Sequence, residues 1–578
     1  MNPCRHSPTP AKPGLLRPLA VILAVLLQCH PSAMAQAADG GENPSTREPA
    51  PTDVTVTLAP GEGTVLCLGT DADFAAVKQS YFTPGAASVE TSAPHATVRP
   101  YRLDYMPMGF YLGDKAFHER NAAAMGLDVW IYLDRLLDKL KAMGANTIYL
   151  QGGALTAPEL PRFVHARGFR IILQMDDLYF RGTDYFKGNA KGPWTQFGGP
   201  REYYEGSLKP RLEAHLPLLE KDPAIWACSP VEELPADSER FFTPYKELIR
   251  RLAPRPVHFQ LDSQQATAAQ LSSKQAPYPD LFGFDRYPWW SQPGNNGDKH
   301  GLSLYLWTPH FTAHWLYGAL KTYADDVHRL YQADSLAVLQ GPATFSYYSK
   351  EDGQRFGWKE DAAFIPPTAP QIRWFPEHGL WGGWSSHLPP PGAESLQSWL
   401  GICAGMKGIL IWAAVFDKPE EVLARVSGSK PAIAPEFHSP VETWEKYAGI
   451  LPTDLTTTPQ SEELAAAWKR IKPLEKLILG LRPSAQAHVA PGKDPNLFIN
   501  SFTDDAGRRF VVVVNGRIGQ WDGNNPAWLD YPNTRLSVGA DGNLTNYTAL
   551  REPRECSITL TKPWKAVDVR KLVAEPTE

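Results

Sequence analysis

Cysteine is scarce in this sequence, and its spacing excludes the commonest cysteine-based metal site. None of the six cysteines stands in a C-x-x-C pair, so a zinc site built on thiolates is not expected. Four remain once an expected export signal is removed: Cys67, Cys228, Cys403 and Cys556. Cys228 and Cys403 fall inside apolar runs and are expected as buried thiols. Cys67 and Cys556 are open to a disulfide in an oxidising compartment.

Several motifs that define enzyme classes are also missing. No G-x-S-x-G turn is present, which disfavours a serine hydrolase, and Gly61-x-Gly63 lacks the rest of a dinucleotide fingerprint. His310 and His314 stand four residues apart without the glutamate of an H-E-x-x-H pattern, so neither a metal site nor a cofactor is expected. Lysine and arginine number 57 against 62 acids, and this lack of a basic excess disfavours a nucleic-acid partner.

Residues 1–35 read as an export signal. A basic start without acids is followed by a short apolar run at 19–27 and by an A-x-A site ending at Ala35, after which cleavage is expected. The alternative is a lipoprotein modified at Cys29, although Gln28 is larger than the small residue expected before such a cysteine. No second apolar run reaches about 18 residues, so no membrane span is expected and the protein is predicted to be secreted or periplasmic.

Short apolar runs alternate with helical segments between residues 105 and 480. The helical pattern is clearest at 130–143, where leucines recur at i, i+3, i+4 and i+7. Eight runs are expected as strands: 108–112, 146–150, 169–173, 224–228, 256–261, 281–284, 336–339 and 408–412. This alternation predicts an α/β protein with a (β/α)8 barrel. The alternative, an open doubly wound sheet, would have a glycine-rich turn after its first strand, and no such turn follows residue 112.

The segments around the barrel have a different character. Residues 36–104 read as a polar linker that leads into a short β lead-in. A helical stretch at 461–479, broken near Pro473, closes the barrel. Residues 482–578 alternate apolar and polar positions between turns rich in Gly, Asn, Asp and Pro, which predicts a C-terminal β-sandwich.

Polar side chains collect at the expected carboxyl ends of the barrel strands, where the catalytic groups of such barrels lie. In chain order they are Asp176, Asp177, Glu232, Glu233, Asp262, Asp285 and Gln340. Paired carboxylates at this face suit glycosidic cleavage, because one can stay protonated as the donor while the other is ionised as nucleophile or base. Any single aspartate is equally well explained as a cap of the following helix, whereas glutamate is a poorer cap.

The segment AIWACSPVEELP at residues 224–235 resembles strand four of the large retaining clan of (β/α)8 glycoside hydrolases, which includes cellulase-like and β-galactosidase-like families. In that clan the strand ends in Asn-Glu-Pro or Asp-Glu-Pro, and its glutamate is the acid/base. The resemblance implies that role for Glu233 and matches Glu232 to the preceding residue. Leu234 stands where the motif has proline, so Glu232 remains an alternative donor.

Two further positions carry the same resemblance, which extends over about residues 105–480. The segment from Asp285 to Pro288 is similar to strand six of these proteins, where the tyrosine, here Tyr287, borders the sugar. Trp412 matches the strand-eight tryptophan that floors the subsite. The resemblance thus implies a polysaccharide or oligosaccharide as the partner of the barrel.

Strand seven departs from the clan at the position of its nucleophile. The clan has a glutamate there, and this sequence has Gln340, whose amide cannot form a glycosyl ester or act as a base. Three interpretations follow. The second carboxylate comes from elsewhere, with Glu377, the Asp176–Asp177 pair and Asp262 as candidates; or the enzyme inverts through a water molecule; or catalysis is lost and the barrel only binds carbohydrate.

Aromatic residues are concentrated in the segments that follow the strands. Trp289 follows strand six, and Trp374 lies in the long segment before the seventh helix. Such rings can stack on the C–H faces of a pyranose, although long loops also need small cores of their own. We expect both uses, and predict that Trp289 and Trp374 contact substrate.

Overall fold

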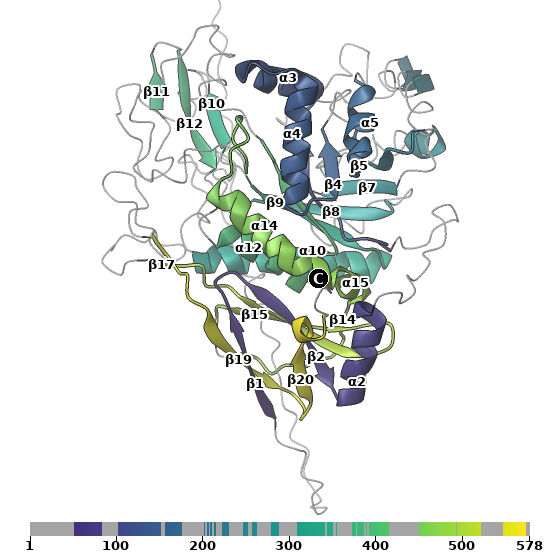
Figure 1. Cartoon of the computed structure of the whole chain (residues 1–578), viewed down its shortest axis with the longest axis vertical. Helices are drawn as coiled ribbons and strands as arrows, with labels where there is room; N and C mark the ends of the chain where they lie inside the picture. Colours follow the sequence, from purple (N-terminus) through teal and green to yellow (C-terminus); the bar gives the residue numbers. More distant parts are fainter. Residues whose placement is uncertain are drawn as a thin grey trace, which may run out of the picture. The chain divides into compact units, whose positions relative to one another are not determined.

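Eight parallel strands close into a barrel, as the sequence predicted (Figure 1). In chain order they are β3 (Met108–Leu112), β4 (Thr147–Leu150), β5 (Arg170–Gln174), β6 (Ile225–Ser229), β7 (Val257–Asp262), β8 (Leu281–Arg286), β9 (Ser335–Gln340) and β13 (Ile409–Trp412). These bounds agree with the eight expected runs to within two residues. β13 pairs with both β9 and β3, which closes the ring.

The computed structural model describes most of the barrel and of the antiparallel sheets. The described residues are 51–83, 102–175 apart from 152–156, 222–229, 257–262, 279–287, 309–341, 392–415, 450–521 apart from 493, and 547–573, with short pieces between these ranges.

Helices surround the strands, and their ends follow local rules. The helices that stand between barrel strands include α3 (Lys115–Ala124), α4 (Val129–Ala142), α5 (Glu159–Ala166), α10 (Pro309–Tyr331) and α12 (Ala393–Ala404). In α4 the Asp128 carboxylate caps the start by accepting the Trp130 N–H at 2.8 Å, and the predicted leucine face is buried. The helical stretch after the barrel is interrupted where expected, because a 3₁₀ turn containing Pro473 separates α14 (Pro459–Ile471) from α15 (Glu475–Gly480).

Alternate residues of each barrel strand face its interior. The interior cluster includes Tyr111, Tyr149, Phe259, Val338 and Leu410, whereas their strand neighbours pack outward against the helices. Tyr111 and Tyr149 stack with their ring centroids 3.9 Å apart. The barrel is therefore filled by side chains, and any ligand has to bind at an end of it.

The antiparallel sheets combine strands from both ends of the chain. A five-stranded sheet has the order β14 (Arg482–Pro483), β15 (Leu497–Thr503), β16 (Arg509–Asn515), β2 (Gly63–Gly69), β20 (Lys565–Asp568), and a two-stranded sheet joins β1 (Thr52–Leu58) to β19 (Arg554–Leu560). The lead-in strands thus belong to the same sheets as the C-terminal strands, because β2 pairs with β16 on one side and β20 on the other.

Two strands of these sheets, β2 and β19, each carry one cysteine, and both cysteines are free thiols. Cys67 of β2 faces the helices of the barrel, while Cys556 of β19 lies in the apolar cluster shared by the two antiparallel sheets. Both thiols are buried and unbridged. The Cys67–Cys556 disulfide that the sequence left open is therefore not formed, because alternation along β2 turns Cys67 to the opposite face of the sheet from that cluster.

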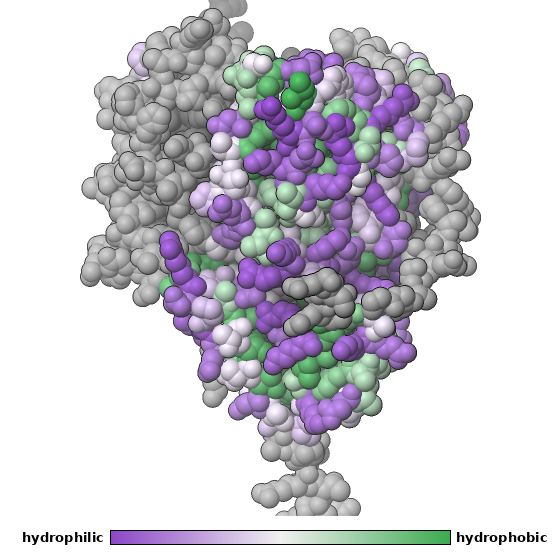
Figure 2. All heavy atoms as spheres, in the orientation of Figure 1, coloured by the Kyte–Doolittle hydropathy of each residue, from purple (hydrophilic) through white to green (hydrophobic). Residues whose placement is uncertain are grey.

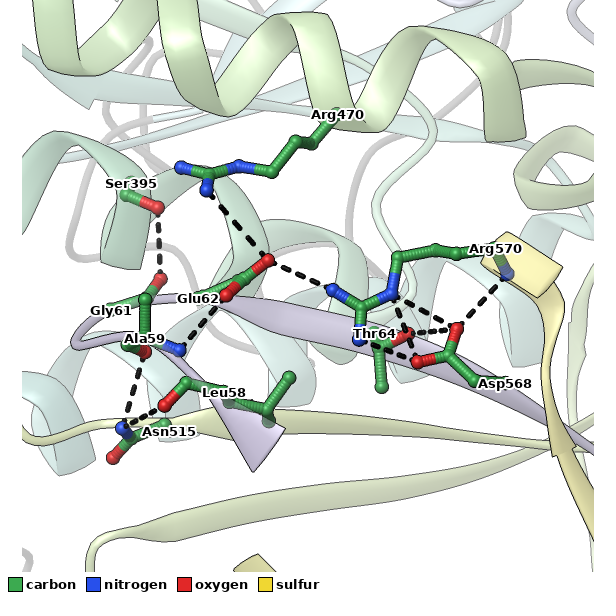
Figure 3. Close-up of polar contacts among 10 residues, drawn as sticks. All are labelled: Leu58, Ala59, Gly61, Glu62, Thr64, Ser395, Arg470, Asn515, Asp568 and Arg570. Atoms are coloured by element: carbon green, nitrogen blue, oxygen red, sulfur yellow. Dashed lines mark hydrogen bonds and ion pairs between the residues drawn. The ribbon is translucent and has the colours of Figure 1, made fainter. Parts of the chain in front are cut away.

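Polar contacts join the turn between β1 and β2 to the helices of the barrel (Figure 3). Glu62 accepts a hydrogen bond from Arg570 at 2.9 Å and lies 3.8 Å from Arg470 of α14. Ser395 of α12 donates to the Gly61 carbonyl at 3.1 Å. Beside them β2 approaches α12 closely, since a Cβ on Gly63 would lie 2.7 Å from the Trp399 ring.

On the face shown in Figure 2, the described surface over the barrel helices is largely hydrophilic. Ile131 and Leu330 are the large apolar side chains of the described part that are most exposed, at 49% and 36%. Among the described helices, none combines the length and the apolar character that crossing a membrane requires.

Candidate active site at the carboxyl ends of the barrel strands

Polar side chains occupy the inner face of the barrel where its strands end. Gln174 of β5, Ser229 of β6, Asp285 of β8 and Gln340 of β9 follow the inward alternation of their strands, and each is at most 1% exposed. Gln174 and Ser229 are register partners on neighbouring strands. The apolar filling of the barrel therefore ends in a layer of amide, hydroxyl and carboxylate groups.

Two aromatic rings lie against this layer. Tyr287 directly follows β8 and Trp412 ends β13, and their ring centroids are 5.2 Å apart with 35° between the ring planes. Both rings are partly exposed and pack on the interior cluster. The sequence predicted that Tyr287 and Trp412 line one subsite, and the structure brings their rings together. The peptide bond between Trp412 and Ala413 is cis.

Gln340 ends strand β9 beside Trp412. The two are register partners, and the next residue, Gly341, donates its N–H to the Trp412 carbonyl at 2.8 Å. The Gln397 side chain of α12 hydrogen-bonds both backbone groups of Gln340, accepting its N–H at 3.2 Å and donating to its C=O at 3.0 Å. The strand-seven position thus carries a buried amide residue whose backbone is held from the helix layer.

Asp262 faces the helices and not the barrel interior. Leu261 belongs to the interior cluster, so alternation along β7 turns Asp262 outward. Its Oδ2 accepts a hydrogen bond from the Tyr323 hydroxyl of α10 at 2.5 Å, and the Tyr323 ring stacks on Phe284 at 4.4 Å. Burial, helped by Tyr331 and Asp285, raises the pKa of Tyr323 well above its ordinary value, so this hydroxyl stays a donor. These contacts suit a packing role, which does not fit the predicted contact of Asp262 with substrate.

The first barrel strand, β3, is followed by an acid that stabilises the next helix. Asp114 accepts the backbone N–H of Phe117 at 2.7 Å and so caps helix α3. The alternative explanation offered for the strand-end aspartates therefore holds for Asp114.

Trp374 lies in a small antiparallel sheet that the chain forms between β9 and α12. This sheet has the order β10 (Thr344–Tyr348), β12 (Leu380–Ser386), β11 (Arg373–Phe375). Trp374 is partly exposed, and the Lys350 ammonium lies 5.6 Å from the centre of its ring. A ring that keeps an exposed portion is compatible with the predicted substrate contact.

Six predicted site residues lie outside the described residues: Asp176, Asp177, Glu232, Glu233, Trp289 and Glu377. Their roles stay predictions. Within the described part of the chain, no three His, Cys, Asp or Glu side chains are grouped so as to hold a metal ion.

The sequence did not single out several residues of this site. Ser229 and the stacked Tyr111 and Tyr149 lie on the inner face, and strict alternation along each strand is the signal that marks them. Gln397 has no such signal. It lies on a helix and reaches Gln340 only through tertiary packing.

A closed barrel of eight parallel strands with polar groups at their carboxyl ends places this chain among the (β/α)8-barrel proteins. No family profile matches the sequence, and no curated protein matches it either. The comparison with solved structures finds similar chains, and glycosidases are among them.

Three of these solved structures show the extent of the likeness. A β-D-glucuronidase from Dictyoglomus thermophilum is 15% identical with a TM-score of 0.35, over 64% of this chain and 51% of that one. A glycoside hydrolase family 5 mannosidase from Rhizomucor miehei is 12% identical with a TM-score of 0.36, over 68% and 99%. A β-galactosidase from the psychrophilic Marinomonas ef1 is 12% identical with a TM-score of 0.36, over 66% and 62%. The fold assignment rests on the strand order of this chain, and those activities belong to those proteins.

Proposed function

We propose that this protein is a secreted glycoside hydrolase that cleaves O-glycosidic bonds of an oligo- or polysaccharide. The observation that carries the proposal is the pair of rings, Tyr287 and Trp412, 5.2 Å apart at the carboxyl ends of the barrel strands. Asp285 of β8 and Gln340 of β9, both buried, are the last inward-facing residues of their strands. Rings beside polar groups suit a pyranose, which offers both C–H faces and hydroxyls.

In this proposal Glu233 donates the proton to the leaving glycosidic oxygen. Glu232 contacts the sugar or tunes its neighbour, and Glu377 or the Asp176–Asp177 pair supplies the second carboxylate. A spacing of about 5 Å between the two carboxyl groups predicts retention at the anomeric carbon, and about 6.5–9.5 Å predicts inversion.

Substrate contacts in the proposal follow the barrel strands. Tyr287 and Trp412 floor the subsite, and Asp285 and Gln340 offer hydrogen bonds to sugar hydroxyls. Trp289 and Trp374 extend the aromatic surface beyond it: Trp289 stands three residues after the end of β8 in the sequence, and the partly exposed Trp374 belongs to the sheet inserted after β9. We also propose that the two antiparallel sheets form the predicted β-sandwich, since they share one apolar cluster.

The test is turnover of aryl glycosides and of a polysaccharide panel by the wild type and by Glu233→Gln. Asp114→Asn is a matched control, because Asp114 is a strand-end acid that caps α3. The proposal expects loss of turnover in the Glu233 variant and wild-type turnover in the control. Equal turnover in all three proteins would remove Glu233 from the mechanism.

A second function, a non-catalytic carbohydrate-binding barrel, is favoured by one observation. The strand-seven position is a fully buried glutamine with its backbone fixed by Gln397, and an amide there supplies no nucleophile. Tight binding of a saccharide by a wild type that turns over none of the panel would select this function.

The proposed export rests on residues 1–35. N-terminal sequencing of the protein recovered outside the cytoplasm should start at Gln36. A lipid-modified Cys29 at the N-terminus would select the lipoprotein alternative instead.

A further inference from the structure

Helix α12 presents a polar residue to the carboxyl end of strand β9. Gln397 is fully buried, and its amide is hydrogen-bonded at both ends to one residue, accepting the Gln340 N–H at 3.2 Å and donating to the Gln340 C=O at 3.0 Å. Only one orientation of the amide satisfies both bonds, so its oxygen and nitrogen are fixed by the backbone that they contact.

The bonds from Gln397 fall where the pairing of β8 with β9 ends. β8 pairs with β9 only as far as the register pair Arg286 and Leu339, one residue before Gln340. The two Gln397 bonds therefore add to the strand pairing at the end of β9. Gly401, one turn further along α12, helps the approach, since a Cβ there would already lie 3.4 Å from the Ala337 Cβ.

The other side of Gln340 is tied to the aromatic subsite. Gln340 is the register partner of Trp412, and Gly341 donates to the Trp412 carbonyl at 2.8 Å. Trp412 in turn lies against Tyr287. Gln397 therefore holds the end of β9 in place. That strand end carries Gln340 and adjoins Trp412, the ring that floors the proposed subsite.

We propose that Gln397 is a positioning residue for the saccharide site, acting through the backbone of Gln340. The inference rests on the proposed function, since it assigns to Gln397 the role of fixing where Gln340 and Trp412 meet a sugar. Without its amide, the end of β9 loses the two bonds that hold it against α12. The backbone of Gln340 is then less fixed, so its side chain is held less well for contact with the saccharide. The affinity for the saccharide therefore falls.

The test compares Gln397→Leu with Gln460→Leu. Gln460 is an equally buried glutamine on α14 that donates to the Pro389 carbonyl at 3.5 Å, so the control makes the same chemical change away from Gln340. Binding of cellohexaose, mannohexaose and xylohexaose is measured by calorimetry well below the melting temperature of every variant. We expect at least tenfold weaker binding for Gln397→Leu and binding within twofold of wild type for Gln460→Leu.

A conservative variant adds a readout that lost packing alone would not move. In Gln397→Glu the protonated carboxyl can both accept and donate as the amide does, whereas the ionised carboxylate can only accept. Affinity should therefore approach that of the wild type near pH 4.5 and fall as the pH rises. A pH profile parallel to that of the wild type would contradict the positioning role.

Amide hydrogen exchange separates the failure of this inference from that of the proposed function. The peptide covering β9 should exchange faster in Gln397→Leu than in the wild type, with β8 unchanged. Equal exchange, or saccharide binding within twofold of wild type, overturns the positioning role of Gln397. A wild type that binds none of the three saccharides and turns over none of the panel overturns the proposed function and the saccharide role with it, while the exchange result still decides whether Gln397 holds the strand end.

Discussion

At the scale of single residues, two of the buried ionisable groups contribute in opposite ways to how stability depends on pH. Glu394, in the first turn of α12, is fully buried, and neither of its oxygens has a hydrogen-bond partner. Burial and the nearby Glu463 raise the pKa of Glu394 well above its ordinary 4.5. Glu463 itself accepts the N–H groups of Gly392 and Ser395, at 2.7 and 2.8 Å. The pair therefore keeps Glu394 neutral in the folded protein.

Replacing Glu394 by glutamine should remove part of the loss of stability at alkaline pH. As the pH rises above 4.5, the unfolded chain releases this proton while the folded chain retains it, so the free energy of unfolding falls until the raised pKa is reached. Glu394→Gln cannot titrate, and we expect it to exceed the wild type by about 1–3 kcal/mol at pH 8 and to match it near pH 4.5. Urea unfolding at both values is the measurement. Glu462→Gln, at an exposed position of α14, is the control that should follow the wild type.

His118 affects stability at the other end of the pH range, because it lowers the free energy of unfolding as the pH falls. It is fully buried in α3, and burial lowers its pKa from 6.5 to about 4. The unfolded chain takes up a proton below pH 6.5 and the folded chain does not, so stability that is present at pH 7 is lost as the pH falls toward 4. Between pH 7 and pH 5 this group should cost the wild type about 2 kcal/mol. The His118→Gln variant should lack that part of the loss in urea unfolding, and the exposed His165→Gln should keep it.

At the scale of secondary structure, the strands and helices of the barrel could be predicted because their signals are local. Apolar runs such as 108–112 and the leucine face of α4 are read from neighbouring residues. Pairings between distant segments could not be predicted. β2 pairs with β16, more than 400 residues later, and nothing in its own sequence names that partner. The same limit hid Gln397, and the direction of Asp262 could not be predicted because it depends on where the alternation of β7 begins.

The close approach of β2 to α12 gives a prediction for these elements. A Cβ on Gly63 would lie 2.7 Å from the Trp399 ring, which is itself fully buried. We expect Gly63→Ala to lower the free energy of unfolding by about 1–3 kcal/mol through overpacking. Gly318→Ala in α10 meets nothing within 4 Å and should be neutral or stabilising. Thermal unfolding of the two variants checks this, and equal melting temperatures would contradict the packing described.

At the scale of the whole molecule, the two ends of residues 50–578 build one set of sheets on the barrel. Glu62 near the start contacts Arg570 near the end, and Arg570 also binds Asp568 through its guanidinium (Figure 3). Both carboxylate side chains are about nine-tenths buried, at 9% and 11% exposure. The contacts of Arg570 therefore stabilise the packing of the lead-in strands against the last strand and the barrel helices.

Removing the Arg570 side chain should lower the free energy of unfolding of residues 50–578. Arg570→Met leaves the largely buried Asp568 without its cation and Glu62 with only Arg470, 3.8 Å away, and we expect a loss of about 2 kcal/mol in the free energy of unfolding. The exposed pair of Lys565 with Asp71, at 65% and 79% exposure, supplies the control. Lys565→Met should change stability by less than about 0.5 kcal/mol. Similar losses of stability in both variants would show that the Arg570 contacts stabilise the protein no more than an exposed ion pair does.

The most direct measurement of the central claim is the hydrolysis rate of one saccharide that the wild type binds, compared with that of Glu233→Gln. If this barrel is a glycosidase with Glu233 as its acid, the variant should keep its affinity for the saccharide and lose about 10²–10⁴-fold in turnover. Turnover of the variant within a few-fold of the wild type would contradict the account.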